Sequence, residues 1–229
     1  MKFKSQILTQ ASGSVGGSTF SRNAGGMYIR ARTVPTNPST AKQELVRSIF
    51  GSLTNVWFST LTNDQRESWK TYSDNVTIVN TLGEPIKIGA LPQYVRSNTS
   101  RIQAGMTRVD DAPAAFNIGE FTDPTLGVVD ASAGTASVAF TNTDDWAGEA
   151  GSSMLLYFSR PQNSTINFFK GPFQYAGRIN GAVSPPSSPA TINLPFAVAA
   201  GQKVFMQVRV SRADGRLSST FLQSGPVSA

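Results

Sequence analysis

The residues that perform most enzyme chemistry are missing from this sequence, since none of its 229 positions is histidine or cysteine. Histidine is the usual general base near neutral pH, cysteine is the strongest side-chain nucleophile, and both dominate zinc sites. Their joint absence argues against most proteases, redox enzymes and metalloenzymes. We therefore predict that the chain is not an enzyme and has no catalytic residue, no cofactor and no metal site.

Carboxylates are the remaining candidates for chemistry, and they gather in one segment. Residues 109–159 contain eight acidic and no basic residues, among them the pairs Asp110-Asp111 and Asp144-Asp145. Neither pair has the alternating oxygen ligands of a calcium loop, and such pairs are typical of turns. Two carboxylates across a cleft can cleave a glycosidic bond. A glycan hydrolase that uses acids of this segment is therefore an alternative hypothesis to a protein without enzyme activity.

A glycine-rich segment near the start resembles a phosphate-binding loop in composition only. Residues 13–19 read GSVGGST, without the Gly-Lys-Ser/Thr of a P-loop and without a helix pattern directly after them. We interpret this segment as part of a flexible or tightly turned arm.

Charge alternates along the chain in three blocks. Residues 1–108 contain 13 basic and 5 acidic residues. The charged residues of 109–159 are all acidic, and residues 160–229 contain 7 basic residues and 1 acid. Opposite blocks predict subunits that attract complementary faces of their neighbours, although solvated faces would give the same pattern. No dense Lys/Arg cluster appears, so nucleic acid is not an expected partner. No run of eighteen apolar residues occurs, so we expect no membrane span.

Residues 1–39 are predicted to form an extended, glycine-rich arm that gains structure against a partner. Within it, residues 27–32 alternate apolar and polar side chains, which is the period of a strand. The expected faces are Met27, Ile29 and Ala31 on one side and Tyr28, Arg30 and Arg32 on the other. We expect Arg30 and Arg32 to pair with acids of a neighbouring subunit, although a solvated strand face is the alternative.

Residues 40–108 are predicted to form a helical subdomain with a short hairpin. A helical pair over about 40–75 follows from an inward stripe at steps of three and four. That stripe consists of Leu45, Ile49, Leu53, Val56 and Trp57. Thr62 with Gln65 forms a capping-box pattern for the second helix, in which Trp69 and Tyr72 face inward. Residues 76–89 suggest two short strands.

A third helix is expected from Ala90 to about Gly105, where glycine favours a helix end. Its inward face would contain Tyr94, Val95, Asn98, Ile102 and Met106. Residues 109–124 are interpreted as an acidic linker. From 125 the period changes to two, and turn signals separate seven short strands, so we predict a fibronectin/Ig-like antiparallel β-sandwich over 125–229. The expected fold class is α+β.

One further residue could contact a partner. Trp146 lies in the expected loop DDWAG, where an exposed tryptophan could anchor a protein or a sugar, whereas burial at the sandwich edge is the alternative. The predicted partner-binding residues are Phe20, Arg22, Tyr28, Arg30, Arg32 and Trp146.

The first half of the chain resembles a loosely defined group of phage and prophage proteins. The group has a glycine-rich arm followed by an IRxRxxPxNPxT segment. This chain is similar to both in GSVGGSTFSRN at 13–23, YIRAR at 28–32 and TNPST at 36–40. Leu61-Thr62, Arg66, Trp69 and Tyr72 are similar to its pattern LTxxxRxxWxxY. Gly89-Ala90, Tyr94, Asn98, Arg101 and Gly105 are similar to its pattern GxxxYxxxNxxRxxxG. The resemblance covers residues 12–106, and the group often ends in a fibronectin- or Ig-like region.

This resemblance implies a virion-associated structural protein, assembled in the host cytoplasm. We expect a capsid decoration or cement protein, or a neck or tail accessory protein, that docks through its N-terminal arm. The expected partners are other virion proteins, namely capsid, portal or neck, or tail subunits, in a homo-oligomer or multi-copy assembly. The alternative is a carbohydrate- or receptor-binding module on a virion or cell surface, which would use Trp146 and the loops at one sandwich end.

Overall fold

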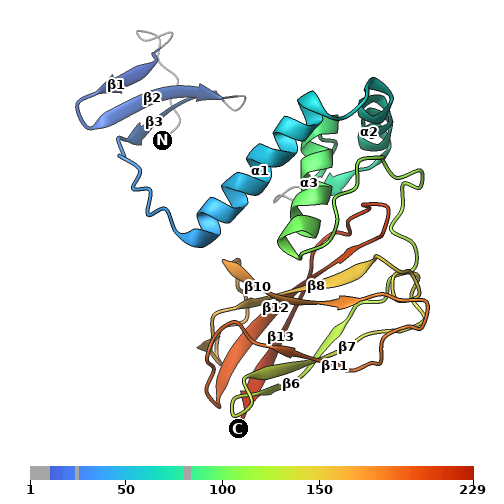
Figure 1. Ribbon diagram of the computed structural model, residues 1–229. Coiled ribbons are helices and arrows are strands. Elements are labelled where there is room, and N and C mark those ends of the chain that lie inside the picture. Colours follow the sequence, from blue (N-terminus) through green and yellow to red (C-terminus); the bar gives the residue numbers. More distant parts are fainter. Residues whose placement is uncertain (1–10, 24–25, 80–83) are drawn as a thin grey trace. The chain divides into compact units, whose positions relative to one another are not determined.

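The computed structural model describes residues 11–23, 26–79 and 84–229 and divides the chain into two compact units, Met1–Gln43 and Glu44–Ala229 (Figure 1). The first unit contains a three-stranded antiparallel sheet in the order β1-β2-β3. Its strands are β1 (Gly13–Val15), β2 (Ser18–Asn23) and β3 (Gly26–Ala31). The expected extended arm is therefore a small sheet over residues 13–31. Gly16, with a φ of +55°, gives the reversal between β1 and β2.

The helical pair is confirmed as α1 (Ala41–Ser59) and α2 (Asn63–Asn75). The capping box is also confirmed: the Gln65 N–H donates to the Thr62 hydroxyl at 3.2 Å, and the Thr62 N–H donates to Gln65 Oε1 at 3.0 Å. Of the expected α1 stripe, Ile49, Leu53 and Trp57 are buried, and Val56 is half-buried. Leu45, however, is 51% exposed, because the first two turns of α1 bury no side chain.

The third helix, α3 (Ala90–Gln103), ends where predicted, since Gly105 follows it with a φ of +70°. The short hairpin is present as β4 (Ile78–Val79) and β5 (Pro85–Ile86), which pair antiparallel; the Leu82-Gly83 turn lies outside the described residues. One apolar cluster holds the helices together. It consists of Ile49, Leu53, Trp57, Leu61, Trp69, Tyr72 and Tyr94.

Eight strands follow the helices within the second unit. They are β6 (Thr125–Asp130), β7 (Thr135–Ala139), β8 (Ser153–Ser159), β9 (Gln162–Asn163), β10 (Phe173–Asn180), β11 (Ala190–Asn193), β12 (Gln202–Ser211) and β13 (Phe221–Ser228). Seven form one path, β10-β8-β12-β13-β6-β7-β11, and β9 pairs with β12. All pairs are antiparallel except β13 with β6, where Val227 lies opposite Val129.

The α+β class is confirmed, but the strands form one continuous curved sheet rather than two separate sheets. The parallel contact between β13 and β6 joins the two halves, and the two ends of the path approach each other. A Cβ added at Gly177 of β10 would lie 3.7 Å from Ile192 Cγ2 of β11. The concave side holds a second apolar core, to which β8 contributes Met154, Leu156 and Phe158. Helix α3 packs against β12.

Candidate interaction surface

The sheet of the first unit has one apolar and one polar face. Residues paired across an antiparallel sheet project to the same side, and the register pairs Phe20 with Ile29, Arg22 with Met27, and Thr19 with Arg30. The apolar face contains Val15, Phe20, Met27, Ile29 and Ala31, with Arg22 at its end. The polar face contains Ser14, Thr19, Ser21, Tyr28 and Arg30. We call residues 11–31 the β-module.

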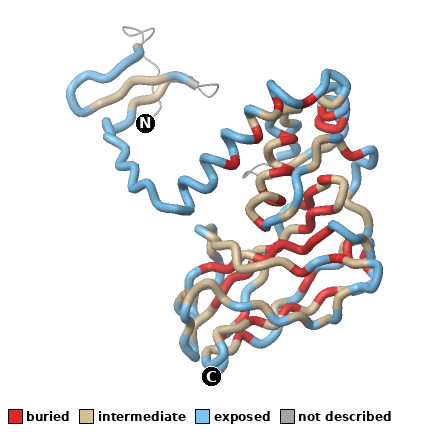
Figure 2. The backbone as a smooth tube through the Cα atoms, viewed as in Figure 1, coloured by how far each residue is buried: buried red, intermediate tan, exposed pale blue. Residues whose placement is uncertain are grey.

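No described residue between 11 and 43 is buried, as the absence of red in this part of Figure 2 shows. Val15 is 74% exposed, and Phe20, Met27 and Ile29 are half-buried. A three-stranded sheet becomes stable when its hydrophobic face is covered. The apolar face of the β-module is therefore a surface that a partner could cover.

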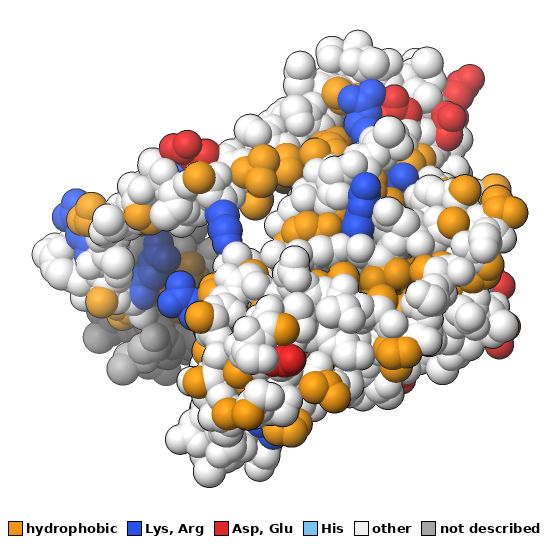
Figure 3. Space-filling view, turned by 60° about the horizontal axis from the view of Figure 1, so that its bottom comes forward, with side chains coloured by type: hydrophobic (Ala, Val, Ile, Leu, Met, Phe, Trp, Pro, Cys, Tyr) orange, Lys and Arg blue, Asp and Glu red, His pale blue; other side chains and the backbone are white. Residues whose placement is uncertain are grey.

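The β-module lies in the most uniformly basic stretch of the chain. Residues 1–43 contain six Lys and Arg residues and no acid. Arg22, Arg30 and Arg32 are exposed and form no ion pair with any described residue. The backbone of Arg32 is fixed all the same, since its N–H donates to the Gly17 carbonyl at 2.8 Å. On the face of the molecule that Figure 3 shows, Lys and Arg side chains lie among hydrophobic side chains.

The structure brings five of the six predicted partner-binding residues together. Phe20 and Arg22 lie on the apolar face, Tyr28 and Arg30 on the polar face, and Arg32 directly after β3. The sequence predicted the two faces of β3, but the pairing of β3 with β2 was missed.

The structure corrects the predicted partner-binding role of Trp146. Its side chain is 1% exposed and packs in the core of the curved sheet, with its ring centroid 5.3 Å from that of Phe140. The loop folds inward because the buried Ser152 hydroxyl donates to the Trp146 and Glu149 carbonyls. Trp146 therefore cannot contact a partner or a sugar in this conformation, and the binding role that depended on it loses its anchor.

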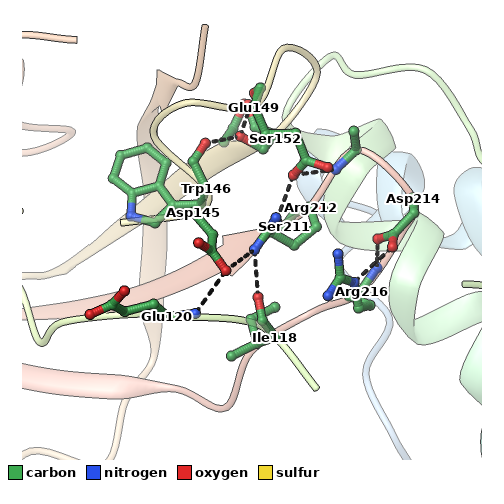
Figure 4. A network of polar contacts seen from close by, with 12 residues as sticks. Ile118, Glu120, Asp145, Trp146, Glu149, Ser152, Ser211, Arg212, Asp214 and Arg216 are labelled. Atoms are coloured by element: carbon green, nitrogen blue, oxygen red, sulfur yellow. Dashed lines mark hydrogen bonds and ion pairs between the residues drawn. The ribbon is translucent and has the colours of Figure 1, made fainter. Parts of the chain in front are cut away.

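The acidic segment is used largely within its own chain. In Figure 4 the Arg212 guanidinium lies between Glu149 on one side and Asp145 and Ile118 on the other. Its Nε lies 2.5 Å from Glu149 Oε2, and its Nη1 lies 3.6 Å from Asp145 Oδ2 and donates to the Ile118 carbonyl at 2.7 Å. Arg216 also holds this segment, because its Nη1 donates to the Asn117 carbonyl at 2.6 Å.

Other acids of this segment accept local hydrogen bonds. Asp144 is buried and accepts the N–H and hydroxyl of Thr122 at 2.8 and 3.0 Å. The Ser132 hydroxyl lowers the pKa of Asp130, and the Ala133 and Ser132 N–H groups act in the same direction. Within the described ranges, only the carboxylates of Glu120 and Asp123 in this segment accept no hydrogen bond and form no ion pair. At these two acids the expected pairing with neighbouring arginines would break no described contact.

Two features were missed by the sequence reasoning. Phe50, Leu91, Pro92, Val95 and Arg96 line an apolar groove of about 320 Å³ beside α1. Its sequence signal is Val46 and Phe50, four residues apart on a second stripe of α1 and 46% and 57% exposed. The other feature is the burial of Gln93, Ser97 and Arg101 on α3, next to Asn98, which was expected to face inward and is buried. That face of α3 lies against the sheet, where the periodicity predicted mainly apolar residues.

Neither a metal centre nor a membrane-spanning helix is found in the described parts of the chain. No three or more His, Cys, Asp or Glu side chains there gather as metal ligands would. No helix there is both long and apolar enough to cross a membrane.

Comparison with known proteins gives little. No family model and no curated protein matches the chain. Among solved structures, it matches a family 76 glycoside hydrolase from a bovine Bacteroides thetaiotaomicron strain, with 16% identity and a TM-score of 0.31 over 47% of this chain and 21% of that one. This match contradicts the prediction that the chain is not an enzyme, and that prediction is withdrawn. A likeness of this extent assigns no activity to the chain.

Proposed function

We propose that this chain is a structural component of a bacteriophage particle that docks onto neighbouring virion subunits through its β-module. The observation that carries the proposal is a sheet with a distinct apolar face and no buried side chain among the described residues of the range 11–43. A partner that covered this face would add apolar contacts to side chains that are at most half-buried in the described residues. The particle location would be the capsid surface, as a decoration or cement protein, or the neck or tail, as an accessory protein.

Burial of the apolar face would supply the main favourable free energy of docking. Fully burying one Val, Ile, Met or Phe side chain contributes about 1.5–3 kcal/mol, and the face offers Val15, Phe20, Met27 and Ile29. Association and ordering of side chains oppose this gain. Several copies in one particle would help, because linked contacts raise the effective concentration of each.

The arginines would select the partner. Arg22, Arg30 and Arg32 are exposed, and residues 1–43 contain no acid that could neutralise them. Guanidinium groups form bidentate hydrogen bonds with carboxylates. We therefore expect an acidic partner surface, on another virion protein or on a second copy.

The resemblance of residues 12–106 to phage and prophage proteins supports a location in the virion. For the C-terminal region we propose a fibronectin/Ig-like relationship. In such folds the first, second and fifth strands pair in one sheet, and the third, sixth and seventh pair in the other. When the two-residue β9 is left out of the count, the order β6-β7-β11 and the order β8-β12-β13 follow that scheme. Strand β10 is then an added edge strand beside β8, and this agreement supports the relationship.

The test begins with particles purified from an induced culture of the strain that encodes the chain. An antibody against the chain should detect it in the particle band of a density gradient in a fixed ratio to the capsid protein. Absence from particles, with the chain present in the lysate, would overturn the proposal.

The docking surface is tested by supplying tagged full-length variants in the same strain. Phe20→Ser combined with Ile29→Ser should reduce incorporation at least tenfold, because both substitutions remove the centre of the apolar face. Thr19→Ser, on the polar face of the same strand, is the matched control and should incorporate normally. Equal incorporation of both variants would contradict docking through this face.

A further inference from the structure

A polar hollow lies where the end of α3 approaches the edge of the curved sheet. Its volume is about 410 Å³. Its walls come from α3 and the turn after it, the start of β8 and the end of β10, and they include Arg101, Ser153, Arg178 and Asn180. All these segments belong to the second unit, so the hollow is separate from the β-module.

Arg101 is fixed in the wall by its own chain. Its side chain is 3% exposed, its Nε donates to the Thr107 carbonyl at 2.9 Å, and its Nη1 donates to the Arg212 carbonyl at 2.6 Å. These acceptors are neutral, so they satisfy the hydrogen bonds of the guanidinium without neutralising its charge. Burial lowers the pKa of Arg101, and the like charge of Arg178 acts in the same direction.

Arg178 and Asn180 supply unused donors. The Arg178 guanidinium forms no hydrogen bond or ion pair with the described residues, and it lines the same hollow as Arg101. The side-chain oxygen Oδ1 of Asn180 accepts from the Ser153 hydroxyl at 3.0 Å, and the same hydroxyl lies 2.5 Å from the Ser152 carbonyl. The bond from Ser153 orients the amide and leaves its NH₂ group available as a donor.

Among the described residues that line the hollow, none is acidic. The acids whose fields reach Arg101 are Glu149 and Asp214, and they are engaged by Arg212 and Arg216 at 2.5 and 2.7 Å. Two like charges beside an unused amide donor therefore face a space large enough for a small molecule. Guanidinium pairs of this kind bind oxyanions through charge-assisted hydrogen bonds.

We propose that this hollow binds an oxyanion, a carboxylate or a phosphate group, between Arg178, Arg101 and the Asn180 amide. The ligand would be a small anion or an acidic group that projects from another molecule. It would be bound whether or not the β-module docks, so the two proposals can fail independently.

Thermal unfolding of the full chain tests this site with two probes, sodium phosphate and sodium glucuronate, against NaCl at the same ionic strength. A specific ligand at about ten times its Kd should raise the Tm by about 3 °C or more. A rise with phosphate alone assigns a phosphate ligand, a rise with glucuronate alone assigns a carboxylate, and a rise with both supports the shared chemistry. No rise beyond NaCl with either probe overturns the proposal.

Variants locate the site. Arg178→Gln removes the unpaired charge and should weaken binding at least tenfold. Asn180→Asp replaces the donor by a carboxylate and keeps an acceptor for Ser153, so it should abolish the Tm rise. Because residue 180 is exposed, the variant should still fold. Arg30→Gln, which removes an exposed arginine of the β-module, is the matched control and should respond as the parent does. An undiminished rise in Arg178→Gln and Asn180→Asp would place the anion elsewhere and overturn the assignment.

Discussion

Arg212 and Glu149 form an ion pair, with 2.5 Å between Nε and Oε2, that ties the residue after β12 to the loop before β8. The arginine side chain is 10% exposed and the glutamate side chain 28%. The same guanidinium donates to the Ile118 carbonyl at 2.7 Å. One side chain thus fixes two segments of the acidic region against the end of a central strand.

Glu149→Gln should lower the free energy of unfolding by about 1–3 kcal/mol, because it leaves a largely buried guanidinium without its main counter-charge. Urea denaturation followed by circular dichroism measures the loss. Arg108→Gln breaks the Arg108–Asp110 pair, whose side chains are 33% and 35% exposed. That control should cost less than about 1 kcal/mol. An equal loss in both variants would mean that burial does not strengthen the Glu149 contact.

The two buried tryptophans should respond differently to replacement by phenylalanine. Trp69 Nε1 donates to the Asp110 carbonyl at 2.8 Å, whereas Trp146 Nε1 is buried without a partner among the described residues. Both changes remove similar volume, but only Trp69→Phe breaks a hydrogen bond and leaves an acceptor unpaired. Trp69→Phe should therefore cost about 1 kcal/mol or more beyond the cost of Trp146→Phe. Guanidinium denaturation of the two variants tests this, and the reverse order would contradict it.

Local patterns predicted local structure well. The capping box of Thr62 and Gln65 and the positive φ of Gly105 depend on residues within one turn, so the sequence alone specified them. The change to a period of two at residue 125 was also predicted, and β6 begins at Thr125. By contrast, the parallel contact between β13 and β6 joins segments almost one hundred positions apart, and no local pattern predicted it.

The candidate site was only half predictable, because its remaining features depend on contacts between distant residues. The alternation of residues 27–32 showed the two faces of β3, but the partner strand β2 follows from register, which a single strand does not encode. For Trp146 the sequence left open exposure in a loop or burial at the sandwich edge, and the structure buries the ring against Phe140. The acids near it appeared free for partners, whereas Arg212, more than sixty positions away, engages Glu149.

The backbone at Gly181 lies close to the loop that contains Trp146, Glu149 and Ser152. A Cβ there would collide with the Trp146 carbonyl and the Ser152 hydroxyl and lie 2.7 Å from the Glu149 carbonyl. Gly181→Ala should therefore destabilise the chain by about 2 kcal/mol or more, through displacement of the loop that holds Trp146. Gly148→Ala, in the same loop with nothing within 4 Å of the added Cβ, is the control and should change the Tm little. Differential scanning calorimetry compares the two variants. A similar Tm for both would show that the loop can move away from the added Cβ without loss of stability.

Ionisation of Tyr72 makes the stability of the chain depend on pH in the alkaline range. Burial raises its pKa to about 12 from 10.0, and the Asp214 carboxylate acts in the same direction. The folded chain therefore keeps the phenol protonated at pH values where the unfolded chain ionises it. The resulting stability is complete below pH 10 and is lost as pH rises from about 10 to about 12, because the unfolded state then releases its proton first.

Tyr72→Phe should flatten this alkaline decline, since phenylalanine has no proton to lose. The Tm of parent and variant measured from pH 8 to pH 11.5 should converge or cross as pH rises, whatever their offset at pH 8. Tyr28→Phe, in the β-module and outside the helical core, should leave the decline of the parent unchanged. Parallel Tm curves for the parent and Tyr72→Phe across this range would exclude Tyr72 as the group responsible.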